Sequence, residues 1–103
     1  MYCVIYEFSV LSGEEALFES AWEELTKLIY AYEGSLGSRL HKSDSGKYIA
    51  YAQWPDQPTH EFAGEHLPPE AEAPRSIMYR GCSEVKTLHT MHMVTDLLKY
   101  PEG

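Results

Sequence analysis

The sequence has 103 residues, and its 16 acidic and eight basic side chains give a formal net charge of −8 at pH 7. Hydrophobic residues make up 44% and charged residues 23%, which is typical of a globular domain and excludes a disordered chain. The acidic balance argues against nucleic acid and anionic membranes as partners, because both are bound through clustered Lys and Arg. We expect one domain over residues 1–103, with a core over about 2–94 and a tail over 95–103.

The sequence shows neither the ligand spacing of a metal site nor the leader of an export signal. Cys3 and Cys82 are far apart, and neither they nor the histidines show metal-ligand spacing. We therefore expect no metal and no organic cofactor. The N-terminus has no basic leader, and no apolar run approaches about 18 residues, so we expect a cytoplasmic protein with no membrane span.

The first third of the chain predicts a strand followed by a helix. Residues 2–10 are rich in β-branched and aromatic side chains, which favour a strand. Ser12 and Glu15 have the spacing of a capping box, so we expect the following amphipathic helix to begin near Gly13. Gly34 is the expected stop signal.

The middle of the chain predicts a hairpin followed by a second helix. Residues 35–43 and 47–54 flank the turn-forming sequence Asp-Ser-Gly at 44–46. Asp56 then fits the N-cap of a helix that we expect to run through His66.

The last third of the chain begins with a proline-rich segment. Leu67–Pro74 contains three prolines in eight residues, so we expect a lid-like connector rather than one regular helix. Residues 75–80 predict a helical turn that Gly81 closes, and residues 83–94 predict a last strand.

This order of elements predicts an α+β fold of the ferredoxin-like type, βαββαβ, with a four-stranded antiparallel sheet. Right-handed crossovers place the first and third strands in the middle and both helices on one face. The hairpin register puts Trp54 on the helix side of the sheet. The uncovered face then carries Arg39, His41, Ile49, Tyr51 and Gln53. This mixture of polar and apolar side chains is typical of a protein–protein interface, so we expect a homodimer.

Two segments resemble the antibiotic-biosynthesis monooxygenase (ABM) domain family. These are Gly34–His41 (GSLGSRLH), after a helix of the appropriate length, and Tyr48–Pro55 (YIAYAQWP). The resemblance covers most of the chain and implies a dimeric α/β barrel. Some relatives are cofactor-free monooxygenases, in which a deprotonated, electron-rich polyphenol itself reacts with dioxygen. Other relatives bind haem and cleave its macrocycle.

Both activities imply a tryptophan, matched here by Trp54, and an asparagine, which this sequence lacks altogether. The oxygenase pattern places the asparagine where this chain has Ala50. The haem pattern places it on the first strand, at about Tyr6. The resemblance therefore implies an altered site, without the family asparagine.

The candidate substrate-binding residues are Trp54, Ala50, Tyr6 and Arg75. A small residue such as Ala50 on the same face as a large aromatic can leave a cavity under the helices, unless side chains such as Trp22 fill it. Arg75 can hold an anionic substrate oxygen.

The catalytic residue stays undecided, with His66, His60 and His41 as candidates, because an unperturbed imidazole titrates near neutral pH. The hairpin register turns His41 away from Trp54 and towards the expected interface. Three functions are open at this point. They are a cofactor-free oxygenase acting on a small aromatic, a non-catalytic dimeric barrel that binds one, and a haem-binding or haem-degrading protein.

Overall fold

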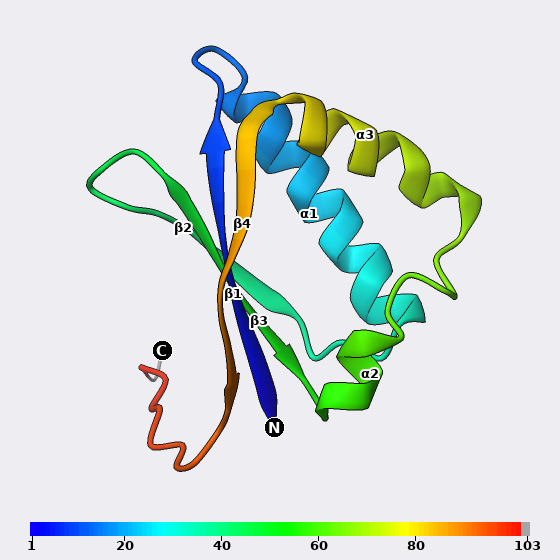
Figure 1. Cartoon of the computed structure of the whole chain (residues 1–103), viewed down its shortest axis with the longest axis vertical. Coiled ribbons are helices and arrows are strands. Elements are labelled where there is room, and N and C mark those ends of the chain that lie inside the picture. The colour runs from blue at the N-terminus through cyan, green and yellow to red at the C-terminus, as the bar shows by residue number, and fades with distance from the viewer. Residues whose placement is uncertain (102–103) are drawn as a thin grey trace.

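The computed structural model describes residues 1–101, and Figure 1 shows one twisted sheet with the longer helices on one side. The elements are β1 (Tyr2–Val10), α1 (Glu15–Tyr32), β2 (Ser38–Lys42), β3 (Tyr48–Trp54), α2 (Gln57–Glu61), the 3-10 helix η1 (Pro69–Ala71), α3 (Glu72–Arg80) and β4 (Cys82–His92). The four strands are antiparallel and lie in the order β2-β3-β1-β4. The predicted ferredoxin-like α+β fold is confirmed.

The hairpin of β2 and β3 has the predicted register, in which Ser38 pairs with Ala52 and Leu40 with Ala50. Gly46 adopts a φ of +89°, a left-handed conformation that glycine reaches without strain. Burial alternates along β3 in this register. The residues that face the helices are buried and the others are half-buried.

Helix α1 begins later than predicted. Its first residue is Glu15, not Gly13, and no side chain caps it, so the predicted capping box at Ser12 does not form. Instead the Glu15 carboxylate accepts a hydrogen bond from the Gly13 N–H at 2.9 Å. The helix ends as predicted, just before Gly34, where φ is +76°.

Helix α2 has the predicted N-cap but is shorter than predicted. Asp56 Oδ1 accepts a hydrogen bond from the Thr59 N–H at 2.9 Å. The helix ends at Glu61 rather than His66. The His66 N–H instead donates to the buried carboxylate of Glu33 at 2.9 Å, a tertiary bond that replaces a helical one.

Leu67–Pro74 is not one regular helix, as predicted, but the prediction of a lid-like connector is wrong. Most of this segment is regular, because η1 leads directly into α3. Pro74 lies in the first turn of α3, where its missing N–H removes no helical hydrogen bond. The segment also packs into the core, since Ala71 and Pro74 are both buried. Gly81 ends α3 as predicted.

The face of the sheet away from the helices has no helix over it (Figure 1). The β1–β3 pairing places Ile5 on this open face beside Tyr51. β4 ends at His92, and residues 93–101 form no helix or strand. Within this tail, the Tyr100 hydroxyl accepts a hydrogen bond from Arg39 of β2. Among the described residues, no helix is sufficiently long and apolar to span a bilayer.

Candidate functional site

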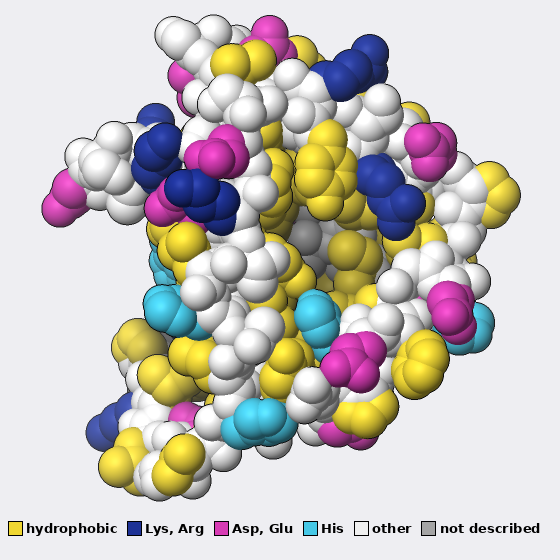
Figure 2. All heavy atoms as spheres, viewed as in Figure 1, with side chains coloured by type: hydrophobic (Ala, Val, Ile, Leu, Met, Phe, Trp, Pro, Cys, Tyr) yellow, Lys and Arg dark blue, Asp and Glu magenta, His cyan; other side chains and the backbone are white. Residues whose placement is uncertain are grey.

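A cavity of about 410 Å³ lies between the sheet and helices α1 and α3. Figure 2 shows a hollow on this side of the molecule, lined largely by hydrophobic side chains. Residues of two core clusters line the cavity, with Phe8 and Met78 from one and Trp54 from the other. Ala50 and Ala52 form part of the lining, and their small side chains leave the space above the sheet open.

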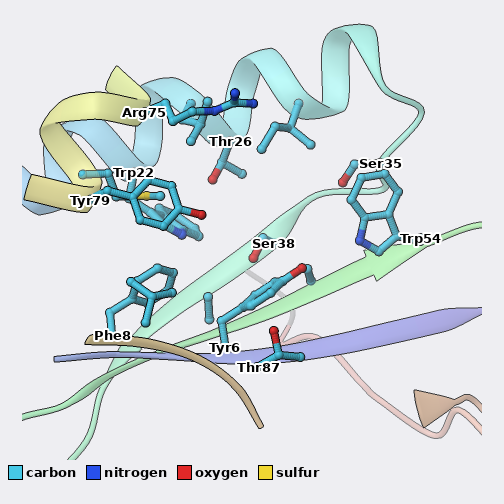
Figure 3. Close-up of a pocket in the computed structure, with 16 residues that line it drawn as sticks. Tyr6, Phe8, Trp22, Thr26, Ser35, Ser38, Trp54, Arg75, Tyr79 and Thr87 are labelled. Carbon is cyan, nitrogen blue, oxygen red and sulfur yellow. The ribbon is translucent and has the colours of Figure 1, made fainter. Parts of the chain in front are cut away.

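Large aromatic side chains stand at both ends of this cavity (Figure 3). Trp22 of α1 and Tyr79 of α3 lie at one end, and Trp54 of β3 lies at the other. Tyr6 of β1 lies between them, on the sheet side. Hydroxyl groups are contributed by Thr26, Ser35, Ser38 and Thr87. The walls can therefore hold a flat apolar body and hydrogen-bond to its edges.

The structure brings together the four residues predicted to bind substrate. Trp54, Ala50, Tyr6 and Arg75 all line the cavity. Arg75 is exposed, so it lies where the cavity meets solvent. No Asp, Glu or His side chain is among the described lining residues, although the whole chain carries a net charge of −8. The wall thus offers hydrogen-bond donors and one cation, but no fixed negative charge.

Trp54 combines burial with a free hydrogen-bond donor. Its side chain is only 4% exposed, and its Nε1 is buried with no hydrogen-bond partner. Figure 3 shows the nitrogen-bearing edge of the indole turned towards the cavity. A buried N–H without an acceptor costs about 1–3 kcal/mol.

Tyr6 connects the cavity to His60. The Tyr6 hydroxyl lies 3.1 Å from His60 Nε2, while His60 Nδ1 is buried with no partner. The His60 ring packs edge-on against Trp54, with ring centroids 5.3 Å apart. Burial lowers the pKa of His60 and raises that of Tyr6, so both side chains are neutral at neutral pH.

The other two histidine candidates lie outside the cavity. His41 is exposed on the open face of the sheet. The His66 side chain is 71% exposed, with Nδ1 3.7 Å from a carboxylate oxygen of Glu33. Within residues 1–101, no group of three or more His, Cys, Asp or Glu side chains is placed to hold a metal ion.

Sequence reasoning named Trp22 only as a side chain that could fill the cavity, and it did not single out Tyr79. Trp22 lies on the same face of α1 as Leu25 and Ile29, a spacing that predicts burial against the sheet. That spacing identifies the face but not whether the space beside it is filled. Tyr79 gave no signal of its own, because its position depends on how α3 packs.

The antibiotic biosynthesis monooxygenase family profile matches residues 1–66 of the sequence. The chain belongs to this family. The resemblance seen in Gly34–His41 and Tyr48–Pro55 is thereby confirmed. A search of curated proteins found no match.

Solved structures with the same fold include other proteins assigned to this ABM family. A candidate antibiotic biosynthesis monooxygenase from Bordetella bronchiseptica is 21% identical, with a TM-score of 0.74 over 91% of this chain and 97% of that one. A second, from Caulobacter crescentus, is 18% identical, with a TM-score of 0.75 over 91% and 90%. SnoaB, a cofactor-independent oxygenase from Streptomyces nogalater, is 17% identical, with a TM-score of 0.73 over 95% and 97%. At these identities the likeness concerns the fold.

Proposed function

We propose that this protein is a cofactor-independent monooxygenase that acts on a small aromatic or polyphenolic substrate bound in the cavity. The observation that carries the proposal is the unpartnered Nε1–H of Trp54, facing a cavity with aromatic walls. Membership of the ABM family and the shared fold with the oxygenase SnoaB support this class of reaction.

The lining suits an electron-rich aromatic with oxygen substituents. The apolar walls take up the ring system, with Trp22 and Trp54 at opposite ends. The Trp54 N–H and the Tyr6 hydroxyl supply hydrogen-bonding groups for substrate oxygens. Arg75 at the opening places a cation where it can stabilise negative charge on the substrate.

The substrate itself would supply the electrons for such a reaction. Loss of a proton from the substrate leaves an electron-rich anion, whose carbon forms a bond to dioxygen. Elimination of water then converts a CH₂ group to C=O, so that one oxygen atom stays in the product and the other leaves in water. The protein's contribution is to hold the substrate away from bulk water and to stabilise the anion.

Because the family asparagine is missing, other side chains have to make the polar contacts with the substrate. Ala50, at the position of the oxygenase asparagine, offers no hydrogen-bonding side chain. Tyr6, at about the position of the haem-type asparagine, offers a hydroxyl in the cavity wall. The proposal therefore assigns the polar contacts to Tyr6, Trp54 and Arg75.

Oxygen uptake in the presence of 1,8-dihydroxyanthrone, with no cofactor added, tests the proposal. We expect uptake that depends on the protein and that ceases when Ala52→Leu fills the cavity. The matched control is Ala73→Leu, at an exposed position of α3 outside the cavity lining. Binding of the probe without oxygen uptake would favour the non-catalytic alternative. Absence of binding would contradict both.

The haem alternative has less support. A haem protein commonly supplies an axial His or Cys, and no such side chain is among the described residues that line the cavity. A Soret shift when haem is added to the protein would reopen this alternative.

We further propose that two copies pair through the open faces of their sheets. Ile5, Ile49 and Tyr51 are half-buried on this face and lie beside the exposed Arg39. Aromatic and aliphatic side chains next to arginine are typical of the core of an interface.

A further inference from the structure

The proposed reaction needs a group that accepts a proton from the substrate. Among the described lining residues, the titratable side chains are Tyr6, Tyr79 and Arg75. At neutral pH a phenol and a guanidinium both carry their protons, so none of the three is a base. The proton acceptor therefore has to lie behind the wall, within reach of a group that lines it.

His60 is placed behind the wall in this way. Its Nε2 is 3.1 Å from the Tyr6 hydroxyl, and that hydroxyl is itself part of the cavity lining. Its Nδ1 is buried without a partner. Within residues 1–101, Tyr6 is therefore the one side chain that forms a hydrogen bond with the His60 ring. The imidazole is thus one hydrogen bond away from a bound substrate.

The surroundings of His60 keep its imidazole neutral and able to accept a proton. Tyr2, with its ring centroid 5.5 Å away, and Trp54, at 5.3 Å, pack against the ring. Burial among these aromatics lowers the pKa of His60, while the adjacent Glu61 carboxylate partly offsets the effect. A neutral imidazole with hydrogen on Nδ1 presents its lone pair at Nε2, towards Tyr6.

We propose that Tyr6 and His60 form a proton relay that deprotonates the bound substrate. The inference rests on the proposed function. The substrate proton moves to Tyr6 Oη as the Tyr6 O–H proton moves to His60 Nε2. The substrate O–H or C–H bond and the original Tyr6 O–H bond break. A new Tyr6 O–H bond and a new N–H bond at His60 Nε2 form. Two neutral groups become a substrate anion and an imidazolium, whose opposite charges attract each other. Tyr6 is the catalytic residue that contacts substrate, and His60 acts through it.

The test compares His60→Gln and Tyr6→Phe with the wild-type protein, using His66→Gln as a matched control outside the cavity. Oxygen uptake with 1,8-dihydroxyanthrone is measured from about pH 5 to about pH 9, together with the absorbance of the bound, ionised probe. At neutral pH we expect both relay variants to lose about 100-fold in kcat/KM. The loss should shrink as rising pH ionises the probe without help from the protein, and His66→Gln should behave as wild type.

The pH dependence separates the relay from a structural role. In the wild-type protein, ionisation of the bound probe should fall once the pH drops below the lowered pKa of His60, because His60 then becomes protonated and accepts no further proton. This measurement needs no variant, so it can refute the relay even if a substitution prevents folding. The relay is wrong if the wild type lacks this acid limb, or if folded His60→Gln retains wild-type uptake. If the wild type shows neither binding nor uptake, the proposed function is overturned and the relay with it.

Discussion

Trp54 is part of the core and part of the cavity wall at once. It belongs to a buried cluster with Tyr2, Val4 and Ala52, yet one edge borders empty space. Trp54→Phe removes the N–H but keeps most of the apolar contact. We expect it to cost about 1 kcal/mol of stability, because the lost donor had no partner, while binding of an aromatic probe weakens.

Paired urea denaturation and probe titration measure the two effects of the Trp54 change separately. Trp54→Ala is the contrasting variant, and we expect it to cost about 3–5 kcal/mol, because it leaves a hole in the core cluster. A folded Trp54→Phe protein that binds 1,8-dihydroxyanthrone as tightly as wild type would remove the indole N–H from the site.

His60 also makes stability depend on pH. Burial lowers its pKa in the folded protein below the ordinary value of 6.5. Between these two pKa values the unfolded chain binds more protons than the folded one, so stability falls as pH decreases through that window. We expect the urea midpoint to drop with pH less steeply in His60→Gln than in wild type. The same dependence of the urea midpoint on pH in both proteins would contradict the burial of the His60 ring. His66→Gln serves as the control.

At the scale of elements, the turn after α1 is held close to α2. Gly34 has a φ of +76°, and a Cβ added there would lie 3.2 Å from the Thr59 methyl group. Gly13, before α1, has a φ of +89° with nothing within 4 Å. Alanine at either position adopts a left-handed conformation at a cost of about 1–2 kcal/mol.

Gly34→Ala should therefore destabilise the protein more than Gly13→Ala. We expect the additional loss to be about 1 kcal/mol, because the new methyl group pushes Thr59 and the start of α2 away. Chemical denaturation of the two variants measures this difference. Equal losses of unfolding free energy in the two variants would show that the turn after α1 and helix α2 are not tightly packed at this point.

The elements show which local signals were reliable. The Asp-Ser-Gly turn at 44–46 fixed the β2–β3 register, because a short loop allows few pairings. The predicted ends of helices were less accurate where a tertiary contact competed. Helix α2 stops at Glu61 because the chain beyond it turns, with the His66 N–H bonded to Glu33 from another part of the sequence.

The candidate site was predictable only in part for a similar reason. Trp54 and Ala50 followed from strand alternation, and Tyr6 and Arg75 were added by the family resemblance and by charge. The contact between Tyr6 and His60 joins residues 54 positions apart, on a strand and a short helix. No local pattern encodes such a contact, because it depends on how α2 folds back over β1.

At the scale of the whole molecule, the open face of the sheet predicts a homodimer. Light scattering should give twice the chain mass of 11.8 kDa, with a total buried area above about 1,200 Å². Ile49→Arg places a charge in the middle of the proposed interface and should yield monomers. Leu17→Arg, at an exposed position of α1, should stay dimeric. A wild-type monomer at micromolar concentration would contradict this assembly.

The central claim is that dioxygen reacts with a substrate held in the cavity and that no cofactor takes part. The most direct test oxidises 1,8-dihydroxyanthrone under ¹⁸O₂ in the presence of the protein. Mass spectrometry then measures the ¹⁸O content of the product, the anthraquinone in which the CH₂ group has become C=O. We expect one ¹⁸O atom in each molecule of the anthraquinone product and the other in water. We expect the reaction to be lost in Ala52→Leu but not in Ala73→Leu. A quinone without ¹⁸O, or release of both oxygen atoms as hydrogen peroxide, would contradict it.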